Sequence, residues 1–243
     1  YWMCEVHNIY GFQGKVADGA YAKYIRLPRT ARNHKLPNDF QFHLAPYIEP
    51  LGCAIHAVER GDIQFNDVVV IAGLGALGLG MVQAARLKNP KLLIAIDIKE
   101  NRNKLAMEYG ADLVFNPKEE DVVSKVKALT NGYGCDVYIQ ASGHPAGVIQ
   151  GLQMIRKLGR YVEFSVYNDP TTVDWSIIGD RKELDLRGAH LSPNTYESAI
   201  RFIHKEQIKP KKVITHEIPL EDFKKGFEMV EKGEESIKVV LIP

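Results

Sequence analysis

From residue 67 onward the chain alternates short apolar runs with amphipathic segments. The apolar runs have the length of strands and cover residues 68–73, 92–97, 111–115, 135–141, 160–166 and 184–189. Between them, segments such as 101–110 and 120–134 have the spacing of helices, and Val122, Val126 and Leu129 share one face of the second. Near-continuous apolar strands alternating with helices indicate a parallel sheet covered on both faces. The pattern therefore predicts an α/β fold with a doubly wound, six-stranded parallel sheet.

The two flanks have a different pattern. Residues 1–46 contain no strand–helix unit, although the segment 19–28 alternates as a β-strand does. The C-terminal flank has a strand–helix–strand pattern that ends in a strand over 238–242. Neither flank can close a core alone. We therefore predict that 1–46 and 207–243 form a second, split domain around a central domain at 47–206.

One stretch has the length of a membrane span. Residues 68–85 carry no charge, but glycines crowd their middle at positions 73, 75, 78 and 80. A β-branched run that stops at glycines fits a buried strand, a turn and a helix better than a spanning helix. We therefore expect no membrane segment here.

Composition and charge argue against several classes of protein, including nucleic-acid-binding and disulfide-rich proteins. The chain is 45% hydrophobic and 25% charged, and 31 Lys and Arg against 30 Asp and Glu leave a formal charge of +1. This balance gives no reason to expect nucleic acid or an anionic membrane as a partner. The three cysteines, Cys4, Cys53 and Cys135, lie far apart, which argues against a disulfide scaffold and fits a reducing compartment. With no targeting segment visible, we expect a cytoplasmic protein.

The residues after the first strand carry the main motif, Gly73-Leu74-Gly75-Ala76-Leu77-Gly78, which fits G-x-G-x-x-G. Gly73 permits a tight turn, Gly75 lets the backbone approach a pyrophosphate, and Gly78 lets helix and strand pack closely. The helix that follows offers free N–H groups to the phosphates. A plain glycine turn without a nucleotide is the alternative.

Asp97 ends the next apolar run and supports the nucleotide interpretation. A carboxylate there accepts hydrogen bonds from both ribose hydroxyls and repels a 2′-phosphate, which favours NAD over NADP. Lys99 and Arg102 lie close enough to weaken this preference. The same fold also hosts methyltransferases and other nucleotide binders, so the fold alone does not establish hydride transfer.

Three other segments carry a resemblance to a known family. They are GAYAKYIRLP, LAPYIEPLGCAIHAVERGDIQFN before the glycine loop, and the closing VITHEIPLEDFKKGFEMVEKGEESIKVVLIP. Together they resemble the zinc-dependent medium-chain dehydrogenase/reductase (alcohol dehydrogenase) family, most of all its polyol branch of sorbitol, erythritol and threitol dehydrogenases. In that family a β-rich, GroES-like catalytic domain is split around a Rossmann nucleotide domain. The resemblance implies NAD-dependent oxidation of a polyol or another secondary alcohol to a ketose or ketone, by a homodimer or homotetramer.

The resemblance also implies zinc, and two residues match its ligands. Glu49, in Glu49-Pro50-Leu51, matches the carboxylate that polyol enzymes contribute to the catalytic zinc, and it is the candidate catalytic residue. Cys4 matches the last of four cysteines that hold a structural zinc. No Gly-His-Glu segment is present, and only His7 has a metal-like spacing to a cysteine. We therefore expect the first part of the catalytic domain, with the remaining ligands, to be missing from this sequence.

Structural alternatives stay open for these positions. Glu49 also fits a helix-start carboxylate, and Cys4 a small buried apolar residue. We interpret His56, His144 and His216 as structural histidines rather than ligands.

Further cofactor contacts follow from the resemblance. Leu77 and Arg102 border pyrophosphate and adenine. The last three apolar runs end at the crevice where open sheets bind ligands, and the residues there are Ala141, Ser142, Ser165, Val166, Ala189 and His190. A helix N-cap is the alternative role for Ser142.

Two other functions remain open. One is a metal-free relative similar to quinone or enoyl reductases, against which the Glu-Pro-Leu segment counts. The other is an NAD-binding module or fragment without catalytic activity.

Overall fold

The computed structural model describes residues 2–5, 9–12 and 18–243. By its internal contacts the chain divides into two compact units. Unit 1 consists of residues 1–49 and 196–243, and unit 2 of residues 50–195.

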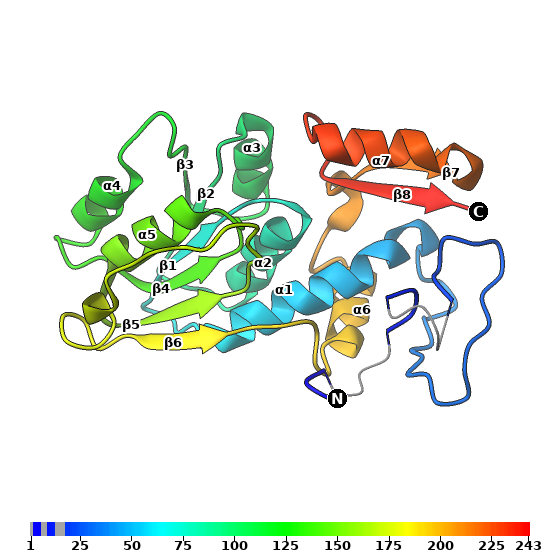
Figure 1. Ribbon diagram of the computed structural model, residues 1–243, viewed down its shortest axis with the longest axis horizontal. Coiled ribbons are helices and arrows are strands. Elements are labelled where there is room, and N and C mark those ends of the chain that lie inside the picture. The colour runs from blue at the N-terminus through cyan, green and yellow to red at the C-terminus, as the bar shows by residue number, and fades with distance from the viewer. Residues whose placement is uncertain (1, 6–8, 13–17) are drawn as a thin grey trace. The chain divides into compact units, whose positions relative to one another are not determined.

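Unit 2 is built on a parallel sheet in the order β3-β2-β1-β4-β5-β6 (Figure 1). Its strands are β1 (Val68–Ala72), β2 (Leu92–Ile96), β3 (Leu113–Phe115), β4 (Cys135–Gln140), β5 (Ile155–Glu163) and β6 (Asp185–Gly188). Every neighbouring pair is parallel. The predicted doubly wound α/β sheet is therefore confirmed. Its direction of winding changes between β1 and β4, which is where such sheets bind ligands.

Five helices connect or precede these strands. They are α1 (Ile48–Arg60), α2 (Ala76–Leu87), α3 (Glu100–Glu108), α4 (Val122–Leu129) and α5 (Pro145–Met154), with a short 3-10 turn, η2 (Trp175–Ile177). Because parallel crossovers are right-handed, α2 and α3 cover one face of the sheet while α4 and α5 cover the other (Figure 1). Among the helices formed by the described residues, none is long and apolar enough to cross a membrane.

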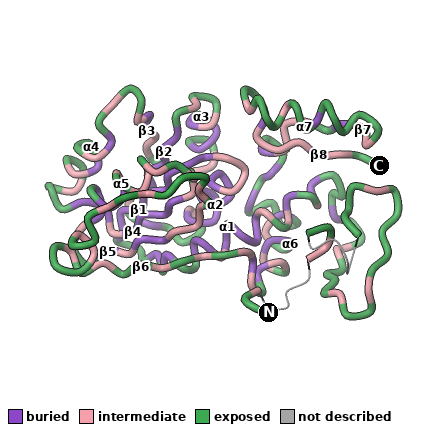
Figure 2. The backbone as a smooth tube through the Cα atoms, viewed as in Figure 1, coloured by how far each residue is buried: buried purple, intermediate pink, exposed green. Residues whose placement is uncertain are grey.

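The core of unit 2 lies along its central strands. All five residues of β1 are buried, as Figure 2 shows for the middle of the sheet. Tyr138 of β4 and Tyr161 of β5 are among the largest buried side chains, and their rings lie 5.3 Å apart. A strand buried on both faces must be apolar throughout, which explains the uninterrupted Val68–Ala72 run.

β5 differs from its predicted bounds. It begins at Ile155, directly after α5, and its pairing with β4 is interrupted by an irregularity. Leu158 lies there with a positive φ of 57°. The strand ends at Glu163, so Ser165 and Val166 lie in the loop that follows rather than in the strand.

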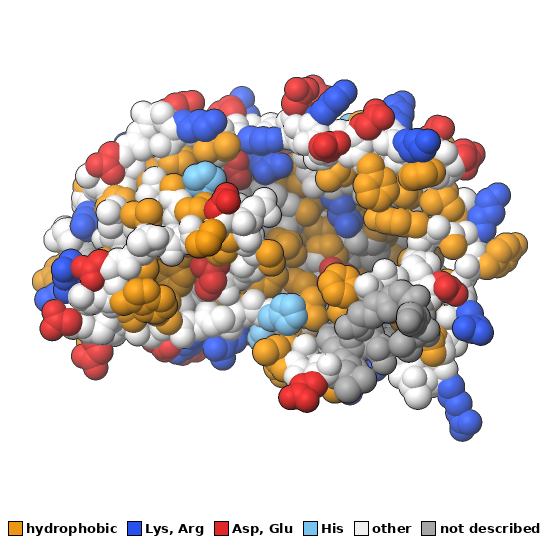
Figure 3. Space-filling model, viewed as in Figure 1, with side chains coloured by type: hydrophobic (Ala, Val, Ile, Leu, Met, Phe, Trp, Pro, Cys, Tyr) orange, Lys and Arg blue, Asp and Glu red, His pale blue; other side chains and the backbone are white. Residues whose placement is uncertain are grey.

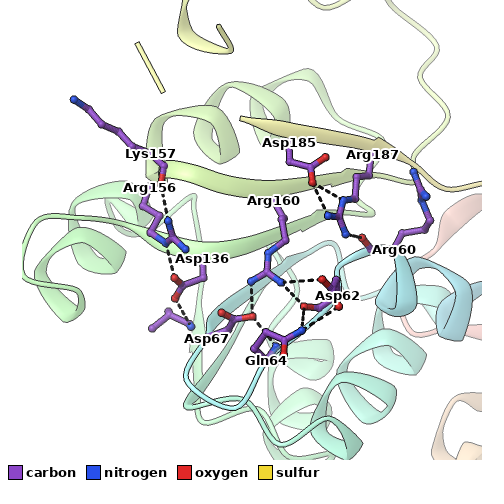
Figure 4. Close-up of polar contacts among 11 residues, drawn as sticks. Arg60, Asp62, Gln64, Asp67, Asp136, Arg156, Lys157, Arg160, Asp185 and Arg187 are labelled. Carbon is purple, nitrogen blue, oxygen red and sulfur yellow. Dashed lines mark hydrogen bonds and ion pairs between the residues drawn. The ribbon is translucent and has the colours of Figure 1, made fainter. Parts of the chain in front are cut away.

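Ion pairs tie the amino ends of the strands together (Figure 4). Arg160 of β5 contacts Asp67, just before β1, with 2.6 Å between Nη2 and Oδ2, and the two side chains are 13% and 9% exposed. The same Asp67 oxygen accepts the Gln64 N–H at 2.7 Å. Asp136 of β4 accepts the Val68 N–H at 2.7 Å. These contacts stabilise the amino ends of the strands, opposite the carboxyl ends where ligands bind.

Unit 1 contains a two-stranded parallel sheet of β7 (Ile214–Pro219) and β8 (Lys238–Ile242). The remaining elements are α6 (Tyr196–His204), α7 (Phe223–Lys232) and the 3-10 turns η1 (Phe42–Tyr47), η3 (Pro210–Lys212) and η4 (Leu220–Asp222). The predicted strand–helix–strand pattern of the C-terminal flank is confirmed. Phe223 and Phe227 of α7 are about half exposed, 45% and 54%. In Figure 3, apolar side chains lie next to charged ones on this part of unit 1.

The strand predicted over 19–28 is wrong. No strand forms there, and Tyr21 and Tyr24 are 71% and 92% exposed. An alternating pattern becomes a strand only when a neighbouring strand takes up its backbone hydrogen bonds. Among the described residues no strand pairs with this segment.

The division into units differs from the predicted domain bounds at 46/47 and 206/207. The structure divides the chain after Glu49 and after Thr195. The larger difference is α6, whose first residue Tyr196 packs its ring 5.3 Å from that of His34. Its last residue, His204, stacks on Phe40 at 6.2 Å. These contacts assign α6 to the flanks.

Candidate functional site

The glycine loop joins β1 to α2 at the carboxyl edge of the sheet in unit 2. Gly73 has a positive φ of 93°, and a Cβ built there would lie 2.5 Å from the Cα of Ser142. Its N–H donates to the carbonyl of Ile96 at 2.8 Å. Neither the backbone conformation nor the space accepts a side chain, so this turn requires glycine.

The other two glycines have opposite surroundings. A Cβ at Gly78 would lie 1.7 Å from the carbonyl oxygen of Gly73, so Gly78 allows α2 to pack on the end of β1. A Cβ at Gly75, the N-cap of α2, would meet no atom within 4 Å. Leu77 lies half-buried in the first turn. Open space before a helix N-terminus, whose first N–H groups have no partner within the helix, fits a pyrophosphate.

Asp97 follows β2 and is 8% exposed. Its Oδ2 accepts the Leu74 N–H at 2.7 Å, and its Oδ1 accepts the Lys99 N–H at 2.9 Å. Arg102 Nη1 lies 3.9 Å from Oδ2. A carboxylate has about four acceptor positions, so this fixed group retains capacity for a ribose diol. The loop and Asp97 together fit the adenosine half of a dinucleotide.

The loops after β4 and β5 are joined by one hydroxyl group. Ala141 continues the sheet by donating its N–H to the carbonyl of Ala72 at 2.8 Å. The Gly143 N–H donates to Ser165 Oγ at 3.0 Å, and that hydroxyl donates to the carbonyl of Gln140 at 3.2 Å. Ser165 therefore links the ends of the two strands.

The N-cap role considered for Ser142 belongs to His144. His144 Nδ1 accepts the Ala146 N–H at 3.2 Å at the start of α5. Ser142 is exposed, and its Oγ accepts the His144 N–H at 3.2 Å and Gln140 Nε2 at 3.0 Å. The Ser142 hydroxyl supports the loop before the helix instead.

The last predicted contacts follow β5 and β6. Val166 is 90% exposed, and Ala189 donates its N–H to the carbonyl of Glu163 at 2.9 Å. His190 is exposed. Burial lowers the pKa of His56 of α1, and the neighbouring Arg60 and His190 lower it further. The predicted cofactor residues therefore all lie in the loops and first helical turns that follow strands of unit 2.

Two polar residues beside this crevice were missed by the sequence analysis. Gln140 is fully buried at the end of β4, and Glu163 is the last residue of β5. Each is the last residue of its strand, at the ligand-binding edge of the sheet. That position was the available signal.

The predicted zinc ligands lie in unit 1. Cys4 is exposed, and Glu49 is exposed in the first turn of α1, as the helix-start alternative expected. Burial lowers the pKa of Lys238, and the charge of Glu49 opposes this shift. His7 lies outside the described residues. Within residues 2–5, 9–12 and 18–243, no three His, Cys, Asp or Glu side chains form a group that could hold a metal ion. The described residues therefore do not make a zinc site by themselves.

Comparison with known proteins gives a consistent result. The sequence pattern described as zinc-binding dehydrogenase matches residues 76–205. The erythritol/L-threitol dehydrogenase of Mycolicibacterium smegmatis is 47% identical over 243 residues, covering 100% of this chain and 67% of that protein. The L-threonine 3-dehydrogenase of Bacillus licheniformis is 36% identical over 232 residues, covering 95% and 66%. A solved structure from Sinorhizobium meliloti 1021 with NADP bound is 26% identical, covers 93% of this chain and 66% of its own, and superimposes with a TM-score of 0.84.

The doubly wound sheet and its glycine loop define the class of the central unit, a Rossmann-type nucleotide-binding domain. The chain belongs to the zinc-binding dehydrogenase family. The resemblance to zinc-dependent alcohol and polyol dehydrogenases is thereby confirmed. The chain spans about two thirds of the length of these two curated relatives.

Proposed function

We propose that this protein takes part in the oxidation of a polyol or another secondary alcohol to a ketose or ketone, with NAD as the hydride acceptor and zinc as a second cofactor. The observation that carries the proposal is the position of Asp97. Its buried carboxylate lies against the glycine loop, 2.7 Å from the Leu74 nitrogen, where it can receive ribose hydroxyls. The 47% identity to an erythritol/L-threitol dehydrogenase supports a small polyol as substrate.

Each part of the crevice has a proposed role. The open space at Gly75 and the N-terminus of α2 take the pyrophosphate, and Asp97 holds the adenosine ribose. Arg102 and Leu77 border the adenine and pyrophosphate. The nicotinamide half takes the loops after β4, β5 and β6, at the six positions 141, 142, 165, 166, 189 and 190. When bound, the dinucleotide would supply the hydride acceptor for oxidation of the carbinol carbon to a carbonyl, with loss of the hydroxyl proton.

Fewer residues of this chain are proposed to bind zinc than to bind NAD. Glu49 is proposed as one ligand of the catalytic zinc and Cys4 as one ligand of a structural zinc. A catalytic zinc needs three protein ligands and a structural zinc needs four. We further propose a cytoplasmic homodimer or homotetramer, for which the oligomeric state in solution is the direct measurement.

Asp97→Ala should reduce the preference for NAD over NADP. The substitution removes the acceptor for the ribose hydroxyls and the charge that repels a 2′-phosphate, together about 1–3 kcal/mol. Because Asp97 also accepts the Leu74 and Lys99 N–H groups, the affinity for both dinucleotides should fall. The informative quantity is therefore the ratio of the two dissociation constants, measured by calorimetric titration.

Asp180→Ala is a matched control, because it removes an exposed carboxylate elsewhere in unit 2. It should leave the ratio unchanged. Equal or tighter binding of NADP by the unmodified protein would contradict the assignment of NAD.

Measurements on one purified sample can distinguish the two alternative functions, a metal-free reductase and an NAD-binding fragment, from the proposed enzyme. A metal-free reductase similar to quinone reductases should reduce its substrate with no bound zinc. An NAD-binding fragment should bind NAD without oxidising erythritol, threitol or sorbitol. Elemental analysis together with a polyol assay distinguishes these outcomes from the proposed enzyme.

A further inference from the structure

A group of hydroxyls surrounds the carboxylate of Glu163 at the end of β5. Its Oε1 accepts the Ser165 N–H at 2.8 Å. Its Oε2 accepts the Tyr167 hydroxyl at 2.9 Å and the Tyr161 hydroxyl at 3.3 Å. Three donors therefore point at one carboxylate, an arrangement that fits its ionised form.

This group is connected to the nucleotide crevice through Ser165. The Ser165 backbone is held by Glu163, while its hydroxyl accepts the Gly143 N–H at 3.0 Å and donates to the carbonyl of Gln140 at 3.2 Å. A Cβ at Gly143 would lie 3.0 Å from the carbonyl oxygen of Val166, so the two loops pass closely. A shift of Ser165 would therefore displace both loops proposed to hold the nicotinamide half.

Glu163 also lines a cavity of about 800 Å³ in unit 2, together with Tyr161, Tyr167, Asp169 and Trp175. Burial raises the pKa of the Glu163 carboxyl group, and its hydrogen bonds oppose the shift. Burial also raises the pKa of Tyr167 to about 12 and that of Tyr161 further. Both tyrosines therefore remain neutral donors at neutral pH, while the cavity gives the carboxyl group a route for proton exchange.

We propose that Glu163 is a positioning residue of the nucleotide crevice, whose ionised carboxylate fixes Ser165 and, through it, the loops after β4 and β5. The proposal rests on the function proposed above, since it assumes that NAD occupies this crevice. The ionisable groups beside Glu163 are Tyr161 on its own strand, Tyr138 on β4 and Tyr167 on the following loop, and Asp169 lines the same cavity. His190 also lies in a loop of the crevice, after β6, so the test compares the unmodified protein with a variant at Glu163.

The test is the dissociation constant of NAD between about pH 5 and about pH 8, for the unmodified protein and for Glu163→Gln. Glutamine keeps the shape and one acceptor oxygen but loses the charge. At the upper end of this range Glu163→Gln should bind NAD about three- to tenfold more weakly. The unmodified protein should lose affinity as the pH falls through the Glu163 pKa, and Glu163→Gln should lack that component.

The free energy of unfolding provides an independent readout. The contribution of Glu163 to it changes with pH in the opposite direction to the contribution of Glu163 to NAD affinity. A raised carboxyl pKa means that the folded protein keeps a proton that the unfolded chain releases. The contribution of Glu163 to stability is therefore largest below the ordinary carboxyl pKa and declines as the pH rises through the raised value. NAD affinity should instead increase over that interval. If Glu163 had only a structural role, Glu163→Gln would change the pH dependence of folding stability but not the pH dependence of NAD affinity.

Matched variants separate the outcomes. Glu183→Gln removes an exposed carboxylate on the segment before β6 and should leave NAD binding unchanged. Tyr167→Phe removes one donor to Glu163 and should weaken binding about twofold, and it decides the question if Glu163→Gln does not fold. If the unmodified protein does not bind NAD, the proposed function fails. If it binds NAD and neither variant changes the affinity or its pH profile, the role of Glu163 is overturned.

Discussion

Replacing Gly75 by valine should lower the affinity for NAD at least about a hundredfold, which corresponds to about 2.7 kcal/mol, while the protein stays folded. Gly75 has a φ of −67°, which any residue adopts, and a Cβ there meets no atom within 4 Å. The branched side chain would therefore occupy the space proposed for the pyrophosphate. Stability should fall by only about 1 kcal/mol, since valine is a poorer N-cap than glycine.

Gly78→Ala provides the contrast within the same loop. Its Cβ would lie 1.7 Å from the Gly73 carbonyl oxygen, so α2 must move away from β1. This variant should lose more than about 4 kcal/mol of folding stability. Calorimetric titration with NAD measures the affinity of Gly75→Val. Thermal unfolding of both variants compares their folding stability. Unchanged NAD affinity in Gly75→Val would show that the loop is an ordinary turn.

Replacing Arg160 by methionine should destabilise the protein by about 3–5 kcal/mol without acting on the nucleotide crevice. The substitution leaves the carboxylate of Asp67, 9% exposed, without its guanidinium partner. The Gln64 N–H then remains on that oxygen, at 2.7 Å (Figure 4). An uncompensated charge that cannot return to water is the cause of the loss. Urea unfolding measures it as a shift of the midpoint at constant slope.

Two further variants test this explanation. Arg160→Met combined with Asp67→Asn removes both charges and should recover part of the lost stability. Arg181→Met breaks an exposed pair with Asp174, whose side chains are 60% and 55% exposed, and should leave the unfolding midpoint unchanged. An equal loss in Arg160→Met and Arg181→Met would mean that burial of the pair does not matter.

The elements of unit 2 were predictable because their signal is local. A strand buried on both faces must be apolar along its length, and a helix on the sheet must repeat its apolar residues every three to four positions. The glycine loop is local in part, since the positive φ of Gly73 and the close approach of Gly78 to the Gly73 carbonyl oxygen involve only a few residues of backbone. Asp97 could be found as well, because it follows the next strand at a spacing set by one strand–helix unit.

Contacts between distant segments could not be predicted in this way. Asp67 and Arg160 are 93 positions apart and meet because β1, β4 and β5 lie side by side. Glu163 is linked to the loop after β4 by the hydrogen bonds of Ser165, and no spacing in the sequence indicates that connection. The segment 19–28 has the alternation of a strand, but no strand in the described part of the chain pairs with it.

The sequence by itself therefore determined the α/β class, the order of strands and helices along the chain, and the glycine loop with its acidic residue. These features depend on the chain's local geometry and on which side chains avoid water. Only the tertiary structure decided that Ser165 links the loops after β4 and β5, which acid pairs with which base, and that α6 belongs with the flanks. Those outcomes depend on the order of strands in the sheet, which brings together residues whose separation along the chain carries no information about their contact.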